Sequence, residues 1–246
     1  MIALGTRSTA DRTRRIQVHS PELHGVKSEW MISDADPVLS PSIFMVEQPA
    51  GVVLPAHFHR NNQFQLIVGG AGKIGPAKLQ PVTIHYAGAN TAYGPLAAGP
   101  DGLMYFTIRP VLESGLNIVA ETPNADWPAG PRVHVTSKPV PIMTVEELRQ
   151  ISVIQTTSGI TGDGGLRADI VLLPPGAELL LSPPAAAQGT FAVVLAGSIS
   201  VAGTWLQVWE SAFFSDDEPD ATIVAGPTGA QTVMLSVPHL DAAYRS

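Results

Sequence analysis

Apolar and polar residues alternate in short runs along most of this chain, and turns rich in Gly, Pro, Asn and Ser separate the runs. A run with a period of two residues, bounded by turn residues, predicts a half-buried β-strand. In the first half, the predicted strands cover residues 15–19, 28–33, 42–47, 51–68 (as a hairpin), 73–75, 82–86 and 102–109. About seven or eight short strands of this kind are enough to close a jelly roll or a small barrel.

The strand pattern begins again at residue 152, beyond a break in the middle of the chain. The predicted strands there cover residues 170–173, 178–181, 190–195, 198–201, 205–209, 211–214, 221–225 and 231–237. Residues 110–143 between the halves are rich in proline, and Thr144 with Glu147 forms a capping box for a helix over residues 145–151. The pattern therefore predicts an all-β chain of three parts: a barrel at 1–110, a connector with a short helix at 111–151, and a second barrel at 152–246.

The hairpin over residues 51–70, GVVLPAHFHRNNQFQLIVGG, carries the most definite chemical pattern. Because successive side chains of a strand point to opposite faces, His57 and His59 share one face of the first strand. For the same reason Gln63 and Gln65 share one face of the returning strand. The opposite faces carry the bulky apolar residues Phe58, Phe64, Leu66 and Val68.

Two interpretations of the polar face of this hairpin are open. In one, the apolar residues face the core and the His and Gln side chains face water. In the other, the polar side chains line the inside of a small barrel. Neutral imidazoles are good ligands for a first-row transition metal, and an amide oxygen can complete such a set.

The spacing of the hairpin resembles the first signature motif of the cupin superfamily. Gly51, five residues, His57, one residue, His59, three residues, Gln63, six residues and Gly70 keep every interval of that motif. The departure is Gln63, where the family usually carries a glutamate ligand. Residues 82–95 resemble the second motif, which normally supplies a third histidine, and Tyr93 takes that position.

The resemblance implies a divalent transition metal in the first barrel, with Fe first and Mn, Ni or Zn as alternatives. The implied ligands are His57, His59, Gln63 and Tyr93. His85, on the strand at 82–86, is a further candidate as a ligand, a base or a substrate contact, although the sequence does not fix which face it occupies. The other candidate substrate contacts are Gln65, Tyr105 and Arg109; the last two share a strand face with Thr107 that points either toward the histidines or to solvent.

The second half echoes the first motif without its histidines. Gly176, Ser182, Pro184 and Gln188 repeat the spacing of Gly51, His57, His59 and Gln63. Serine is a feeble metal ligand and proline is none. The chain thus resembles a bicupin, with two tandem jelly-roll (double-stranded β-helix) barrels of which the second keeps only the fold. An acidic run at residues 216–220 is predicted to be a solvated turn, with a cation site as the alternative.

Composition narrows the function classes. The chain has 246 residues, 14% of them charged, a formal net charge of −7 and no cysteine. The acidic balance without a basic stripe argues against nucleic-acid and anionic-membrane partners, and disulfides and thiolate sites are absent. Residues 1–15 read as a frayed tail around Arg12, Arg14 and Arg15, with no apolar leader, so a cytoplasmic location is the default.

Two functions follow from these observations. The first is a metal-dependent bicupin enzyme acting on a small molecule, for which the resemblance implies dioxygenase, decarboxylase, isomerase or lyase chemistry. The alternative is a non-catalytic small-molecule-binding or regulatory cupin that has lost metal ligands. A role in assembly is a third possibility, and the family's habit of pairing barrels implies a homo-oligomer, such as a dimer.

Overall fold

The structure is a computed structural model. The model describes residues 1–20, 23–34, 36–113, 115–123, 127–181, 184, 186–218 and 221–244. Ser182, in the echo of the first motif, and Asp220 of the acidic run therefore lie outside the described residues. Neither α-helix of the described part has the length and apolar character needed to cross a membrane.

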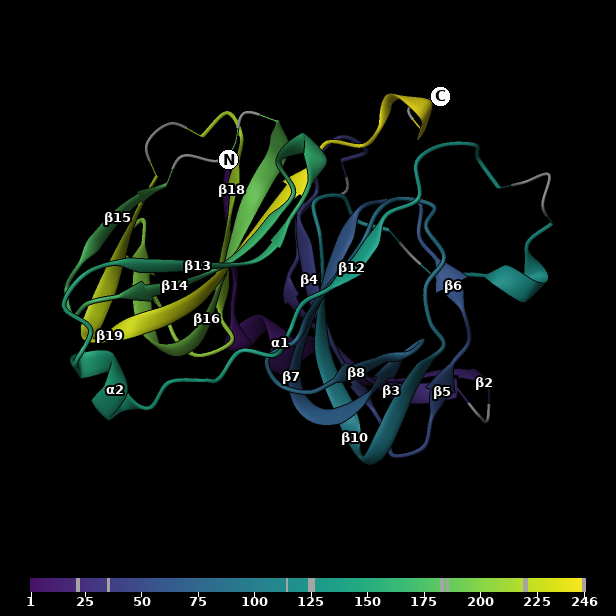
Figure 1. The fold of residues 1–246 in the computed structure, drawn as a ribbon, viewed down its shortest axis with the longest axis horizontal. Coiled ribbons are helices and arrows are strands. Elements are labelled where there is room, and N and C mark those ends of the chain that lie inside the picture. Colours follow the sequence, from purple (N-terminus) through teal and green to yellow (C-terminus); the bar gives the residue numbers. More distant parts are fainter. Residues whose placement is uncertain are drawn as a thin grey trace. The chain divides into compact units, whose positions relative to one another are not determined.

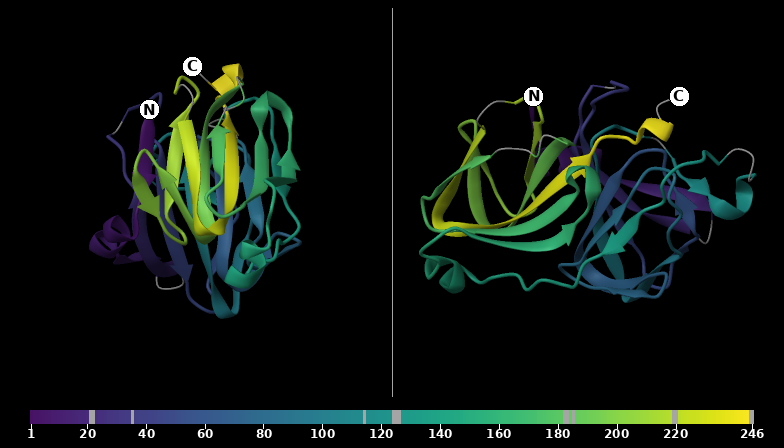
Figure 2. Two further views of the ribbon diagram at one scale, coloured as in Figure 1. Left: turned by 90° about the vertical axis from the view of Figure 1, so that its left-hand side faces the viewer. Right: turned by 45° about the horizontal axis from the view of Figure 1, so that its top comes forward.

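The chain forms two compact units, each treated separately here (Figures 1 and 2). The first unit comprises Ala10–Val140 together with the chain end from Leu240. The second unit comprises Met1–Thr9 and Pro141–His239. In each unit the strands curl into a barrel, as predicted for tandem jelly rolls.

The first unit is built on a nine-stranded sheet of order β12-β9-β7-β10-β4-β3-β2, with β5 on β10 and β8 on β7. Strands β11 and β6 pair with each other in a separate two-stranded sheet. The strands are β2 (Arg15–Ser20), β3 (Leu23–Met31), β4 (Ser42–Gln48), β5 (Val53–Leu54), β6 (His57–Phe58), β7 (Gln63–Ile74), β8 (Ala77–Leu79), β9 (Ile84–Ala87), β10 (Leu96–Arg109), β11 (Asn117–Ile118) and β12 (His134–Thr136). Two 3-10 helices belong to it, η1 (Val119–Glu121) and η4 (Ala242–Tyr244).

The second unit is built on an eight-stranded sheet of order β1-β18-β16-β19-β14-β13, with β15 on β19 and β17 on β16. The strands are β1 (Ile2–Gly5), β13 (Gln155–Thr161), β14 (Arg167–Leu173), β15 (Glu178–Leu181), β16 (Ala187–Val201), β17 (Thr204–Leu206), β18 (Ser211–Ser215) and β19 (Ala221–Pro238). The helices are α1 (Arg7–Thr13), which begins in this unit, α2 (Val145–Arg149) and the 3-10 helix η3 (Asp163–Gly165).

The start of the chain differs from the predicted frayed tail. Ile2–Gly5 pairs antiparallel with β18, with Ile2 opposite Phe214, so this strand completes the sheet of the second unit. Ile2 and Leu4 pack against the apolar cluster of that unit. The basic residues beyond are also paired, since Arg14 contacts Glu47 and Arg15 contacts Glu29. Ile2 and Leu4, which precede the basic cluster, therefore belong to a strand that pairs with a strand far away in the sequence.

The middle of the chain is divided between the units instead of forming a separate connector. Within it, β12 joins the sheet of the first unit by pairing with β9. The helix α2 belongs to the second unit, and its predicted capping box is present: Glu147 N–H donates to the Thr144 hydroxyl, and Thr144 N–H donates to the Glu147 carboxylate. The unit boundary at Val140 and Pro141 thus lies inside the predicted connector at 111–151.

The register of the first unit decides which side chains share the inner face. Gln65 lies opposite Thr107 and His85, and Thr107 lies opposite Phe44. Directly opposed residues point to the same side of a sheet, so these four side chains form one row across β9, β7, β10 and β4. The row resolves the face of His85, which the sequence left open: it is the face of Gln65.

Gly70, the last residue of the predicted first motif, permits a bend in the long strand β7. Its φ is +64°, a region that side chains rarely adopt. A Cβ at this position would lie 2.2 Å from the carbonyl oxygen of Gly102 on β10. The register between β7 and β10 shifts in the same region, between the pairs of Ala98 and Leu103. Glycine is thus required by both the dihedral angle and the close approach of the two strands.

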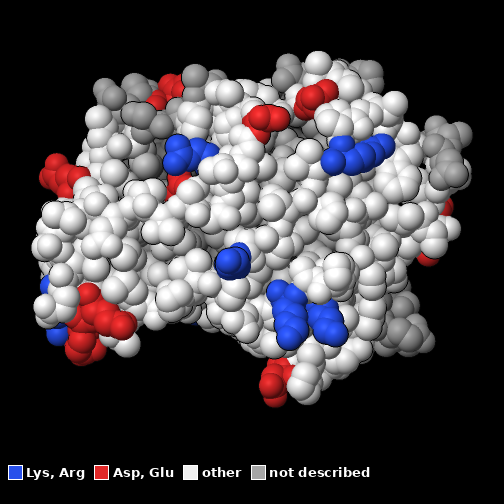
Figure 3. Space-filling view, in the orientation of Figure 1, with Lys and Arg blue, Asp and Glu red and all other residues white. Residues whose placement is uncertain are grey.

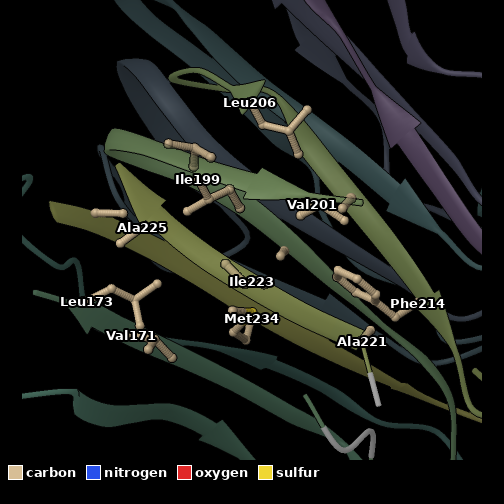
Figure 4. Close-up of a cluster of buried hydrophobic side chains, with 14 residues drawn as sticks. Val171, Leu173, Ile199, Val201, Leu206, Phe214, Ala221, Ile223, Ala225 and Met234 are labelled. Atoms are coloured by element: carbon tan, nitrogen blue, oxygen red, sulfur yellow. The ribbon is translucent and has the colours of Figure 1, made fainter. Parts of the chain in front are cut away.

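The core of the second unit is an apolar cluster drawn from β14, β16, β17, β18 and β19 (Figure 4). In the figure the side chains of Ile199, Val201, Ile223 and Phe214 point toward one another, and all four are buried. Fully burying such a side chain contributes about 1.5–3 kcal/mol relative to leaving it exposed. This cluster therefore stabilises the second barrel through apolar packing.

Candidate functional site

A cavity of about 120 Å³ lies in the first unit and is lined by side chains from its main sheet and hairpin. Six of the eight predicted site residues line it: His57, His59, Gln65, Tyr93, Tyr105 and Arg109. The interpretation in which the polar face of the hairpin lines a barrel interior is therefore correct for these side chains. Thr107 also lines the cavity, so the shared face of Tyr105, Thr107 and Arg109 points inward.

Backbone pairing brings Tyr93 to the histidines. His57 N–H donates to the Tyr93 carbonyl at 3.1 Å, and Tyr93 N–H donates to the His57 carbonyl at 3.0 Å. Asn90 N–H donates to the carbonyl of His59 at 2.6 Å. The turn after β9 is thereby fixed beside β6, and Tyr93 takes the place that the sequence predicted for it beside His57.

A directional chain of hydrogen bonds connects four of the site side chains. Arg109 Nε donates to Gln63 Oε1 at 3.0 Å, and because arginine has only donors, the Gln63 amide nitrogen must point the other way, toward the Tyr93 hydroxyl. His57 Nδ1 lies 2.8 Å from the carbonyl oxygen of Pro55, which only accepts, so Nδ1 carries the proton. His57 Nε2 then accepts the proton of the Tyr93 hydroxyl at 2.8 Å.

Arg109 stands at the centre of the remaining contacts. Its Nη2 lies 3.0 Å from Nδ1 and 3.1 Å from Nε2 of His59, and its Nη1 donates to the carbonyl of Glu113 at 2.9 Å. The side chain is only 2% exposed. A guanidinium buried to this extent needs hydrogen-bond acceptors on several sides, which the His59, Gln63 and Glu113 groups supply.

Glu113 is a site residue that the sequence analysis missed. It follows β10 in the loop and lines the cavity. Its carboxylate accepts hydrogen bonds from the backbone N–H groups of Arg60 and Asn61 and lies 3.6 Å from His59 Nδ1. Since this contact spans about fifty residues of chain and depends on the loop path, the local pattern around Glu113 carries no signal for it.

The protonation states follow from burial and neighbouring charge. Burial lowers the pKa of His57 to about 4; burial and the charge of Arg109 lower the pKa of His59 to about 4 as well. Both imidazoles are thus neutral at neutral pH. Burial raises the pKa of the Tyr93 phenol well above its usual value, so it stays protonated. Burial opposes ionisation of Glu113, but contacts with His59 and Arg109 outweigh it and lower the pKa to about 2.

As arranged, the four implied ligands do not fit a divalent metal ion. The lone pair of His57 Nε2 is taken by the Tyr93 hydroxyl, and Gln63 Oε1 is taken by Arg109. Tyr93 is a protonated phenol, and the guanidinium adds a positive charge about 3 Å from His59. Within the described part of the chain, no three His, Cys, Asp or Glu side chains gather as a ligand set. The metal site implied by the resemblance stays a prediction.

His85 lies on the inner face but not at the cavity wall. Its Nδ1 is 2.8 Å from the Thr136 hydroxyl, and its ring centroid is 5.3 Å from that of Tyr93. Its Nε2 is buried without a hydrogen-bond partner among the described residues. Burial lowers the pKa of His85 to about 3, which keeps this imidazole neutral. His85 therefore packs near Tyr93 outside the cavity lining. The substrate contact predicted for His85 stays a prediction.

Further cavity residues come from β3 and β4, which the sequence analysis treated as plain strands. They include Lys27, Phe44 and Gln48. Phe44 and Val46, two positions apart on β4, share a face, and both line the cavity. That face could be assigned to the site only once the register of β4 against β10 was known.

The charged side chains on the face shown in Figure 3 stand singly or in small groups, with uncharged surface between them. This distribution agrees with a chain in which 14% of the residues are charged. The exclusion of nucleic-acid and membrane partners stays a prediction, as do the homo-oligomer and the cytoplasmic location.

No protein-family model and no curated protein matches the chain. Solved structures do match it along almost its whole length. A proposed dioxygenase from Nostoc punctiforme has a TM-score of 0.66 at 12% identity, covering 98% of this chain and 84% of the other. The bacterial pirin YhhW of Escherichia coli, in complex with nickel(II), has a TM-score of 0.57 at 12% identity, covering 97% and 99%.

An oxalate decarboxylase from Lactobacillus farciminis, solved as a formate complex, has a TM-score of 0.62 at 10% identity, covering 96% of this chain and 86% of the other. At such identities the likeness is one of fold. It extends over both units, and the oxalate decarboxylase is itself a bicupin. Together with the two barrels and the inward-facing His-x-His hairpin, these likenesses show that the chain has a fold of two tandem cupin-like jelly-roll barrels, as in a bicupin.

Proposed function

We propose that the first barrel is a small-molecule-binding site that works without a resident metal, as a binding or regulatory cupin. One observation carries the proposal: Arg109 supplies a fixed positive charge among the side chains that the resemblance assigns to a metal. It donates to Gln63 Oε1 and contacts His59, while Tyr93 donates to His57 Nε2. The acceptor atoms of Gln63 and His57 that would bind a metal ion therefore accept hydrogen bonds from Arg109 and Tyr93 instead.

The same network supports binding over turnover. Both site histidines are neutral, Tyr93 is a protonated phenol, and Glu113 is ionised but held by backbone N–H groups. A general acid or base works best when its pKa lies near the working pH. The groups of this site titrate far from neutrality, so they serve to position a ligand through fixed donors and acceptors.

A second candidate is the metal-dependent enzyme, such as a dioxygenase, isomerase or lyase, with iron as the first choice of metal. The convergence of His57, His59, Gln63 and Tyr93 favours it. The fold is also that of a proposed dioxygenase and of a pirin in complex with nickel(II). This function requires Tyr93 and Arg109 to give up the contacts that now occupy His57 and Gln63.

Metal uptake separates the two functions. The purified protein and its His57→Ala variant would each be titrated with iron(II) and nickel(II) in a calorimeter, with elemental analysis after removal of free metal. We expect both proteins to retain the same low metal content. Stoichiometric metal in the wild-type protein that is lost in the variant would overturn the metal-free proposal in favour of the enzyme.

A further inference from the structure

We propose that the cavity of the first barrel takes a small organic anion, with its carboxylate held by Arg109 and Lys27 and a hydroxyl or amino group directed to Gln48. The proposal deepens the proposed function and rests on it, because it names the class of ligand for the same cavity. Each part of the ligand is inferred from a different group of side chains.

Two cations that line the cavity both lie near one aromatic ring. Lys27 Nζ lies 3.8 Å from the ring centroid of Phe44, and the Arg109 guanidinium carbon lies 5.4 Å from the same centroid. Glu113 is the one carboxylate among the lining residues, so the described lining carries one excess positive charge. Like charges in a partly buried space repel, and an anion bound near both cations relieves the repulsion.

Existing partners leave both cations able to take a further acceptor. Arg109 has five N–H donors, and the described contacts use one on each of its three nitrogens, to Gln63, Glu113 and His59. One N–H remains on each terminal nitrogen, and each can donate to a carboxylate oxygen. Lys27 pairs with Glu29 at 3.1 Å, which leaves two of its three ammonium protons.

Gln48 shows that the ligand also carries a hydrogen-bond donor. Its amide nitrogen donates to the carbonyls of Val52 at 2.7 Å and Leu96 at 3.1 Å, which fixes the orientation of the amide. Its Oε1 is buried without a partner among the described residues, and it belongs to the cavity lining. The Oε1 of Gln65, another lining residue, is likewise buried without a hydrogen-bond partner among the described residues. Buried acceptors without donors are costly, and a ligand hydroxyl or amine satisfies them.

The size and the apolar side of the cavity set the remaining part of the ligand. The volume of about 120 Å³ is slightly below the roughly 150 Å³ of an apolar protein cavity that accepts benzene. Phe44, Val46 and Leu54 line the cavity between its polar groups. A short carbon chain fits this space, with the carboxylate at the cationic side and the donor group at Gln48.

The test compares matched pairs of small probes by titration calorimetry with the full chain. The probes are butyrate, 4-hydroxybutyrate and acetate, each with its neutral amide, and the proteins are the wild type, Lys27→Met and Lys78→Met. Lys27→Met keeps the length of the stem and removes the charge. Lys78 is an exposed lysine on β8 outside the cavity, so its variant is the matched control.

We expect 4-hydroxybutyrate to bind best, butyrate less well and the amides about tenfold or more weaker than their acids. Lys27→Met should weaken the acids by about tenfold and leave the amides unchanged, whereas Lys78→Met should match the wild type. Equal binding of acids and amides would overturn the anion and leave the metal-free small-molecule site standing. Absence of binding by every probe would also overturn the inference of an anion. The metal titration described above tests the proposed function separately.

Discussion

Arg109 Nε donates a hydrogen bond to Gln63 Oε1 over 3.0 Å, and this contact orients the whole site. It directs the Gln63 amide nitrogen to Tyr93, whose hydroxyl then donates to His57. A glutamine suits this arrangement because it accepts from Arg109 and donates to Tyr93 at the same time. An ionised glutamate could accept only, so the departure from the family motif at Gln63 and the presence of Arg109 have one explanation.

Restoring the family's glutamate at position 63 alone should not create a metal site. Gln63→Glu places a carboxylate where Arg109 Nε now donates, and a buried arginine and carboxylate form a strong paired contact. We expect nickel(II) to bind about as weakly as to the wild type. Adding Tyr93→His and Arg109→Met supplies a third imidazole and removes the cation, and the triple variant should bind nickel(II) about tenfold or more tightly by calorimetry.

His57→Ala in the background of that triple variant is the control. It should return the nickel(II) affinity to the level of the wild type, because a ligand nitrogen is removed. If instead Gln63→Glu alone binds nickel(II) tightly, Arg109 does not hold the site in its metal-free form.

The strand pattern and the motif spacing predicted the local features of this site. Alternation placed His57 and His59 on one face, which depends only on residues close together in the sequence. The capping box at Thr144 is a feature of the same kind. In both cases the geometry of one strand or one helix turn is enough to decide the contact, whereas Tyr93 was placed beside the histidines by the resemblance of residues 82–95 to the second cupin motif.

Contacts between distant segments could not be predicted in this way. Gln63 and Arg109 are forty-six positions apart, and their hydrogen bond requires the pairing register of β7 and β10. The pairing of β1 with β18 joins two segments that are far apart in the sequence. A run of four residues carries no signal that identifies its partner strand. Glu113 reaches Arg60 and Asn61 through the path of a loop.

Tyr93→Phe should destabilise the first unit. The hydroxyl accepts from the Gln63 amide and donates to His57 Nε2, so its removal leaves two buried polar atoms without their partner. We expect the free energy of unfolding to fall by about 1–3 kcal/mol, measured by denaturant unfolding. Tyr86 is a matched control, because it is buried in the same unit and its hydroxyl has no hydrogen bond among the described residues. Tyr86→Phe should change the value by about 0.5 kcal/mol or less, and an equal loss in both variants would contradict the role of the Tyr93 hydroxyl.

Glu113→Gln should also lower stability. The substitution keeps the shape of the side chain but removes the negative charge that faces Arg109 and weakens the acceptor for the N–H groups of Arg60 and Asn61. Hydrogen bonds to a charged group contribute more than neutral ones, so we expect a loss of about 1–3 kcal/mol in thermal or denaturant unfolding. Glu121, exposed on η1, is the control, and Glu121→Gln should be nearly neutral. A neutral Glu113→Gln would mean that the carboxylate is dispensable for holding the loop.

Three buried histidines should make the stability of the protein depend on pH. Burial lowers the pKa of His57 and His59 to about 4 and that of His85 to about 3, against a usual value of 6.5. Below pH 6.5 the unfolded chain binds protons at these positions while the folded protein does not. The free energy of unfolding is therefore at its full value above pH 6.5 and falls as the pH drops toward 4. Each histidine adds a slope of up to about 1.4 kcal/mol per pH unit.

Glu113 adds a second loss at lower pH, since its pKa falls from 4.5 to about 2 in the folded protein and the unfolded carboxylate takes up its proton first. Denaturant unfolding across this range measures both windows. His85→Asn retains an amide that can reach Thr136 but cannot titrate, so its slope between pH 6.5 and 4 should be shallower than that of the wild type by up to about 1.4 kcal/mol per pH unit. A wild-type slope in His85→Asn would show that this imidazole is already protonated in the folded protein or is not buried, because only a neutral, buried His85 penalises the folded state as the pH falls.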